Sequence, residues 1–198
     1  MAVNYYGRAT QGKPAPNTLY QYGTFASGLV QYALILGALY AISRGDRQLL
    51  ALRRPRSWRR ALLLAFGALV AIAIVTQVLD PLLHGAREQG LTPKGWEPSH
   101  AGAYVANAVL IAGVAPFVEE LLFRGLGFSL LRGFGVWKAI VAIGIVFAAA
   151  HGLVEAFPEL AFFGAALAWL RSRTESVYPG MLVHATFNAV ALVAAVVK

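Results

Sequence analysis

The chain has 198 residues, of which 58% are hydrophobic and 13% charged, and its mean hydropathy is +0.60. This composition excludes an ordinary soluble domain and favours a polytopic membrane protein. The absence of cysteine excludes disulfides, thiolate metal sites and a cysteine nucleophile. The net charge of +8 comes mostly from arginines in a few loops, a pattern typical of membrane orientation. We therefore expect one all-α domain over residues 1–198, a polytopic membrane bundle of about six transmembrane helices.

Two apolar runs, residues 24–42 and 61–79, are each long enough to cross a bilayer as a helix. The loop between them, residues 44–60, carries seven arginines against a single acid, Asp46. We predict that this loop is cytoplasmic and contacts anionic lipid, because cytoplasmic loops of membrane proteins are enriched in Arg and Lys. We expect a multi-pass protein of the prokaryotic plasma membrane. No nucleic-acid partner is expected, because the loop is short and lies between two spans.

Four further apolar segments are predicted after a polar loop at residues 82–100, whose histidines, His84 and His100, are interpreted as surface residues. The third span begins near residue 101, and the remaining three cover 139–150, 160–170 and 181–197. With six spans, the basic loops 132–138 and 171–173 fall on the same side as loop 44–60. Both termini are then predicted to lie on the opposite, external side.

Glu119 and Glu120 interrupt the third apolar segment. One interpretation ends the helix at Glu119 and makes the acids a charged helix end at the membrane surface. We prefer a helix that continues to Arg132, because residues 121–131 are mostly apolar and carry no charge except that of Arg124. Glu119 then lies 13 residues, or about 20 Å, from that end of the helix. Ionisable side chains at such depth are costly and usually face a bundle interior or a wet cavity, which favours a functional site.

The spacing of the charges predicts different roles for the two acids. Neighbouring helical residues point about 100° apart, so Glu119 and Glu120 face different directions. Glu120 and Arg124 are spaced i,i+4 in the favourable order for an ion pair, which leaves Glu119 available for chemistry. Pro116 removes a backbone donor close to the acids and is expected to kink the helix beside the site.

Two later segments contribute further polar groups. His151 lies about 21 Å along its helix from the basic interface, which matches the depth predicted for Glu119. Phe147 and His151 share a helical face, as do His184 and Asn188, since both pairs are spaced i,i+4. A single intramembrane histidine is more often a hydrogen bonder between helices, but two histidines with two carboxylates favour an active site.

Three motifs, in this order and on separate spans, resemble those of the CPBP family: Glu-Glu-x-x-x-Arg (119–124), Phe-x-x-x-His (147–151) and His-x-x-x-Asn (184–188). This is the family of membrane-embedded CAAX prenyl endopeptidases and bacteriocin-processing or immunity proteins (Abi). The resemblance covers residues from about 105 to 195, which would form the catalytic core. It implies an intramembrane glutamic endopeptidase in which Glu119 and His151 activate water. His184 and Asn188 would stabilise the oxyanion.

The residues themselves support the same chemistry. Peptide hydrolysis needs a base for water, an acid for the leaving amine and donors for the oxyanion. Glu119 can act as the base while His151 shares or orients the water. The Asn188 amide and a ring nitrogen of His184 can donate to the oxyanion. We expect three further residues to support the site: Glu120, Arg124 and Phe147.

Other functions remain open. Glu119, His151 and His184 could form a three-ligand site for a divalent metal such as zinc, with an open position for water. We expect no cofactor, because the sequence lacks a His-Glu-x-x-His motif and these ligands would come from three helices. A non-catalytic immunity or regulatory protein could use the cluster for packing. A proton-coupled transporter is disfavoured because no inverted repeat is visible.

The expected substrate is a peptide or protein in or at the membrane, cleaved near the interface. A prenylated peptide, a C-terminal sorting signal and a leader peptide all fit this expectation. Serine-protease chemistry is disfavoured: Ser129 lies near the first motif, but the sequence has no Ser/His pairing with nucleophile-elbow glycines.

Overall fold

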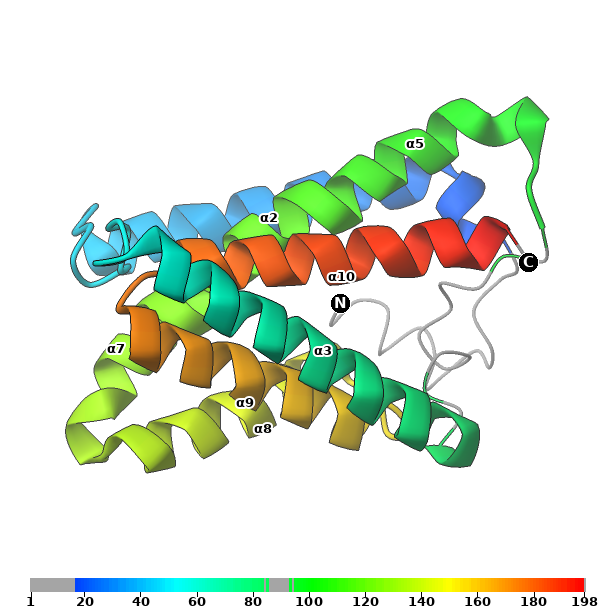
Figure 1. Ribbon diagram of the computed structural model, residues 1–198. Coiled ribbons are helices and arrows are strands. Elements are labelled where there is room, and N and C mark those ends of the chain that lie inside the picture. Colours follow the sequence, from blue (N-terminus) through cyan, green and yellow to red (C-terminus); the bar gives the residue numbers. More distant parts are fainter. Residues whose placement is uncertain (1–16, 84, 86–92, 94, 198) are drawn as a thin grey trace.

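The computed structural model describes residues 17–83, 85, 93 and 95–197, and Figure 1 shows their helices packed side by side along one axis. Every regular element in these residues is helical, which confirms the predicted all-α bundle. Four of the described helical stretches are long and apolar enough to cross a membrane: α2 (Tyr22–Ser43), α3 (Trp58–Leu83), the continuous stretch Pro98–Phe134 and α10 (Tyr178–Val196). The chain is therefore an integral membrane protein.

The third span is an uninterrupted series of helical segments, as the preferred interpretation predicted. It comprises η2 (Pro98–His100), α5 (Ala101–Val109), η3 (Leu110–Val114), α6 (Ala115–Glu119), η4 (Glu120–Gly127), α7 (Phe128–Leu131) and η5 (Arg132–Phe134). Two of these segments, η3 and η4, are wound as π-helix, which is uncommon and frequent at functional sites. Glu119 is only 6% exposed between them, so the alternative of a charged helix end at the surface is wrong.

The fourth and fifth predicted segments form a hairpin, α8 (Val136–His151) and α9 (Phe157–Thr174). Gly152 ends α8 in the left-handed conformation, with φ 65°. The two helices pack closely because glycines face each other: a Cβ on Gly144 would lie 2.6 Å from the Ala161 carbonyl oxygen. Helix α9 packs against α8, α3 and α10, which shelters its polar residues and explains why this segment is less apolar than the others.

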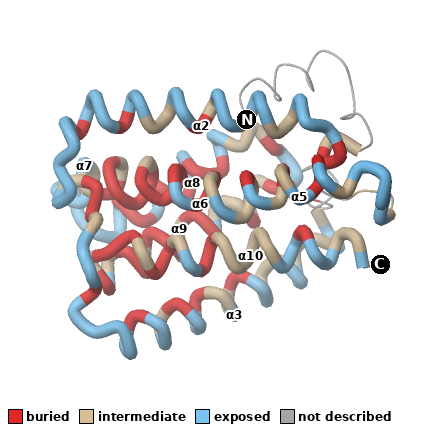
Figure 2. Tube along the Cα trace, turned by 90° about the horizontal axis from the view of Figure 1, so that it is seen from above, coloured by how far each residue is buried: buried red, intermediate tan, exposed pale blue. Residues whose placement is uncertain are grey.

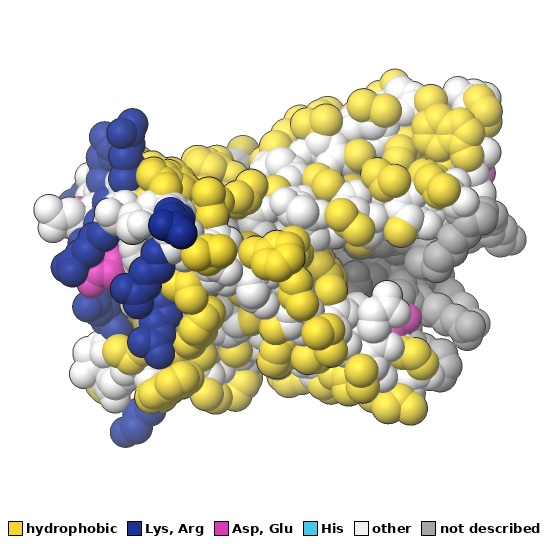
Figure 3. Space-filling model, viewed as in Figure 1, with side chains coloured by type: hydrophobic (Ala, Val, Ile, Leu, Met, Phe, Trp, Pro, Cys, Tyr) yellow, Lys and Arg dark blue, Asp and Glu magenta, His cyan; other side chains and the backbone are white. Residues whose placement is uncertain are grey.

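Burial is concentrated where α6, α8, α9 and α10 meet, whereas α2 and α3 leave most of their outer surfaces uncovered (Figure 2). Those outer surfaces carry large apolar side chains, including Leu34 at 70% exposed and Phe66 at 67% exposed. In the space-filling view, hydrophobic side chains cover much of the face shown (Figure 3). This is the surface expected of helices that face lipid.

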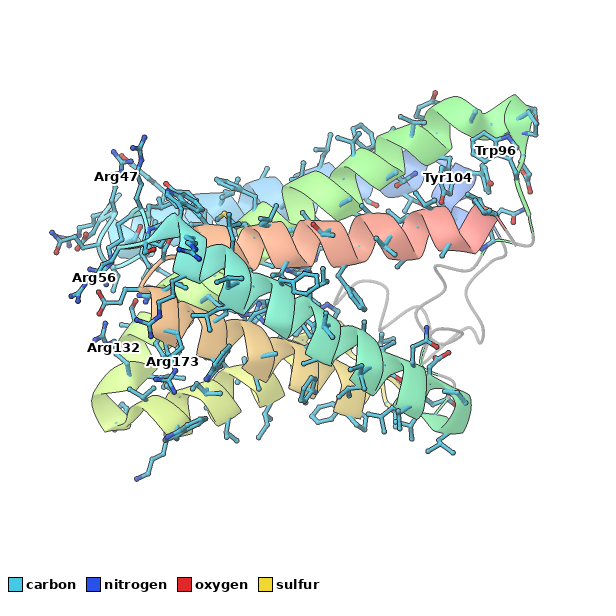
Figure 4. All side chains as sticks on the ribbon, viewed as in Figure 1. Arg47, Arg56, Trp96, Tyr104, Arg132 and Arg173 are labelled. Carbon is cyan, nitrogen blue, oxygen red and sulfur yellow. The ribbon has the colours of Figure 1, made fainter. Side chains whose placement is uncertain are left out.

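The basic loops gather at one end of the bundle (Figure 3). Arg47, Arg56, Arg132 and Arg173 all lie there, while Trp96 lies at the opposite end (Figure 4). The beginning of α2 and the end of α10 also lie at that opposite end (Figure 1). The prediction that the basic loops share one side is therefore confirmed for their positions in the bundle.

The two histidines of the polar loop have different outcomes. His100 is exposed and lies next to Ser99 and Glu97, as predicted for a surface histidine. His84 lies outside the described residues, as do Arg87, Glu88 and Lys94 of the same loop.

Candidate active site

The predicted ion pair between Glu120 and Arg124 is present at the centre of the bundle. Nη1 of Arg124 donates to Oε1 of Glu120 at 2.8 Å, and neither side chain is exposed to solvent. Nη2 of Arg124 donates to the Gly164 carbonyl oxygen on α9 at 3.1 Å, and the guanidinium carbon lies 4.5 Å from the Phe147 ring centroid on α8. One arginine therefore connects the first motif to two other helices.

His184 of α10 lies between the two glutamates. Its Nδ1 is 3.2 Å from Oε1 of Glu120, and its Nε2 is 3.9 Å from Oε2 of Glu119. The first distance is a hydrogen bond, whereas the second is too long for one. Glu120 therefore does more than pair with Arg124, because it also orients this histidine. Gly180, one turn before His184, permits the approach, since a Cβ there would lie 2.5 Å from Oε2 of Glu120.

His151 lies at the last residue of α8, where the glycine turn begins. Its Nδ1 is 2.8 Å from the Phe147 carbonyl oxygen. A carbonyl oxygen can only accept, so this bond places the hydrogen on Nδ1 and leaves Nε2 as the free ring nitrogen. His151 is also within electrostatic range of Glu119, His184 and Arg124. The three predicted motifs are thus brought together.

Asn188 binds a backbone carbonyl that Pro116 leaves free. In η3 the Ala115 N–H donates to the Leu110 carbonyl oxygen, five residues back. The next such bond would join residue 116 to the Ile111 carbonyl oxygen, but proline has no N–H. Nδ2 of Asn188 donates to that oxygen instead, at 2.9 Å. An amide nitrogen has two hydrogens, so one remains for a ligand.

Two phenylalanines pack on the histidines. The Phe147 ring centroid lies 4.4 Å from that of His151 and 6.0 Å from that of His184. Phe163 of α9 packs edge-on against His184, with 4.9 Å between ring centroids. Phe147 was predicted as a supporting residue from its motif. Phe163 was missed, because an aromatic residue in an apolar run gives no signal of its own.

Sequence reasoning also missed Tyr32 on α2. Its hydroxyl donates to Oε1 of Glu119 at 2.8 Å, a hydrogen bond between residues 87 positions apart. A tyrosine in an uncharged span resembles any other apolar position, and no spacing rule joins it to the glutamates. Glu119 has no i,i+4 partner on its own helix, but it has a hydrogen-bond partner on the first span.

The fit of a metal was tested on the same residues. Within residues 17–83, 85, 93 and 95–197, no three His or acidic side chains form a group that could hold a metal ion. The predicted alternative ligand set of Glu119, His151 and His184 therefore does not fit a metal in this arrangement.

This geometry can be compared with known proteins. Residues 101–190 match the model of one family. That family is described as type II CAAX prenyl endopeptidase Rce1-like, and the matched residues are called the Rce1-like segment below. No curated protein and no solved structure matches the chain. The match agrees with the resemblance to the CPBP family and spans all three motifs, which supports a membrane protease. The Rce1-like segment contains η3, η4 and the residues bound to His184, but it leaves out α2 and α3.

Proposed function

We propose that this protein is an intramembrane endopeptidase that hydrolyses a peptide bond with water activated by Glu119 and His151. The observation that carries the proposal is the burial of Glu119 and Glu120 around His184, inside the segment that matches a CAAX endopeptidase family. An ionisable residue buried inside a membrane bundle is a functional-site hypothesis by default.

The first step is the activation of water. Tyr32 occupies Oε1 of Glu119, which leaves Oε2 to accept a proton from water. Nε2 of His151 has no described hydrogen-bond partner and can orient or share that water. The water oxygen attacks the substrate carbonyl carbon while its proton passes to the glutamate.

The second step needs donors for the oxyanion that forms. The second hydrogen of the Asn188 amide is one donor, because the first is held by Ile111. Nε2 of His184 is the other. Since Nδ1 donates to Glu120, Nε2 carries a hydrogen only in the imidazolium form. As the carbon–nitrogen bond breaks, the proton held by Glu119 passes to the leaving amine, which yields a carboxyl terminus and a free amine.

The substrate proposed for this site is a lipidated peptide or one that bears a C-terminal signal, cleaved near the membrane interface. The hydrophobic side chains on the face shown in Figure 3 are suited to contact with a lipid-attached chain. The test is incubation of the detergent-purified protein with a proteome-derived peptide library, in prenylated and unmodified forms. New termini should appear with the natural protein and not with Glu119→Ala. Folded natural protein that generates none would favour the non-catalytic immunity or regulatory alternative.

We propose that the reaction uses no metal, because Glu119 and His151 can make all the proton transfers. Chelator treatment followed by elemental analysis tests this. Full activity without stoichiometric metal is the expected result. Bound zinc or iron, with activity that follows occupancy, would overturn it.

We also propose that loop 44–60 is cytoplasmic and binds anionic lipid. Arg56 is 92% exposed in its side chain, at the end of the bundle where the arginines gather. Each cation near an anionic surface contributes about 1 kcal/mol. Anionic vesicles should raise the unfolding temperature over neutral ones, and Arg54→Gln with Arg56→Gln should reduce the difference. An equal unfolding temperature in both vesicles would contradict lipid binding.

A further inference from the structure

The hydrogen bond between Tyr32 and Glu119 brings the first span into the site. Tyr32 is 7% exposed and Glu119 6% exposed, so water does not compete freely for either group. A buried hydroxyl that donates to a carboxylate makes a charge-assisted bond, which is shorter and stronger than a neutral one. The observed separation of 2.8 Å fits such a bond.

The packing of α2 delivers this hydroxyl. Tyr32 lies on the buried stripe of α2 together with Leu39 and Ser43. Gly28, one turn before Tyr32, allows close contact, because a Cβ there would collide with the Leu110 side chain. Tyr32 also belongs to an apolar cluster with residues of the glutamate-bearing helix, including Val118 and Leu121. The packing of α2 and that of the glutamate-bearing helix therefore both fix the contact between Tyr32 and Glu119.

The bond has a specific consequence for the carboxylate. The terminal torsion of a glutamate is broad, so burial alone does not fix which oxygen faces the substrate. With Oε1 held by Tyr32, Oε2 is directed to the side of His184, at 3.9 Å from Nε2. That distance leaves Oε2 without a hydrogen bond to the ring, so Oε2 retains the capacity to accept from a water molecule in the site.

We infer that Tyr32 is a positioning residue of the active site, which selects Oε2 of Glu119 as the oxygen that activates water. This inference rests on the proposed function. It extends the site to α2, which lies outside the Rce1-like segment. Residues 101–190 alone would therefore lack one component of the machinery.

The test is Tyr32→Phe, which removes only the hydroxyl, with Tyr104→Phe as the matched control. Tyr104 is equally buried, and its hydroxyl donates to the Leu192 carbonyl oxygen at 2.7 Å, away from the glutamates. Tyr32→Phe should lower kcat about 10- to 100-fold with KM unchanged, because small misplacements of a catalytic group have effects of this size. Tyr104→Phe should leave kcat unchanged. Unchanged kcat in folded Tyr32→Phe, or an equal loss in both variants, would overturn the inference.

A spectroscopic readout separates this inference from the proposed function. The carboxylate bands of Glu119 are obtained as the infrared difference between the natural protein and Glu119→Gln. They should shift in Tyr32→Phe and not in Tyr104→Phe, whether or not a substrate is cleaved. Absence of that shift would refute the role of Tyr32. Absence of any cleavage, with the shift present, would refute the endopeptidase and leave the positioning contact in place.

Discussion

At the scale of single residues, Glu119 and Glu120 are distinguished by their partners. Glu120 contacts two cationic or titratable side chains, Arg124 and His184, and its role is to hold them. Among the residues that the structure describes, Glu119 has one hydrogen bond, from Tyr32 to Oε1, while Oε2 lies 3.9 Å from Nε2 of His184. The difference follows from the helix itself, since neighbouring positions point about 100° apart. The two adjacent acids therefore approach His184 from different sides and are not interchangeable.

Glu120→Gln should mainly reduce stability. The change removes the charge opposite a fully buried arginine, and breaking a buried pair typically costs about 3–5 kcal/mol. We expect a lower unfolding temperature and a fall in kcat of one or two decades at most, of the order seen when a supporting group is lost. Thermal unfolding and kcat per folded molecule measure both effects. A variant of normal stability would contradict the assigned role.

Asn188→Ala should lower kcat about 10²–10³-fold with KM nearly unchanged, as for a lost oxyanion donor. Asn188→Asp should be at least as damaging, because a carboxylate cannot donate and would face the Ile111 carbonyl oxygen. A structural asparagine would instead reduce the amount of folded protein and leave its turnover normal. The measurement is kcat per folded molecule, and an unchanged value in Asn188→Ala would contradict the oxyanion role.

At the scale of the helical elements, the π-wound turns position the side chains that we propose as catalytic. Helical spacing predicted the pair of Glu120 with Arg124, because i,i+4 neighbours adjoin in any regular turn. It did not predict that Ile111 would accept from Asn188, because a π register depends on tertiary packing. Tyr32 was missed for a similar reason: side-chain spacing carries information along a helix and not between helices. The motifs could be recognised in the sequence, but the hydrogen-bond partners of Glu119 and Asn188 on other helices could not.

Pro116→Ala tests the link between helix winding and the oxyanion donor. The new N–H would compete with Asn188 for the Ile111 carbonyl oxygen, and the amide would lose its fixed orientation. We expect kcat to fall about tenfold or more through misplacement of the amide. The control is Pro81→Ala, which alters a proline inside α3 and should leave kcat unchanged. Equal effects of the two substitutions would indicate a general change in helix stability.

At the scale of the whole molecule, the fold follows closely from apolar runs and arginine positions. The all-α class, the unbroken third span and the gathering of the basic loops were all predicted. The lengths of α8 and α9 were less predictable, because the polar residues of α9 are sheltered by α3, α8 and α10. The four long spans and the hairpin together enclose the site.

Reporter fusions should place Arg56 and the C-terminus on opposite sides of the membrane, with Arg56 in the cytoplasm. The reason is that loop 44–60 and the end of α10 lie at opposite ends of the bundle. A fusion after Arg173 serves as a control and should report the same side as Arg56. Finding Arg56 and the C-terminus on one side would contradict this arrangement.

The most direct test of the central claim is kcat per folded molecule of Glu119→Gln on a cleaved peptide. Glutamine keeps an oxygen that can accept from Tyr32, so the packing should be preserved, but it cannot accept a proton from water. The account predicts folded protein with no detectable cleavage, while Glu120→Gln retains activity. Full cleavage by Glu119→Gln, with activity lost in Glu120→Gln, would contradict it and reverse the roles of the two acids.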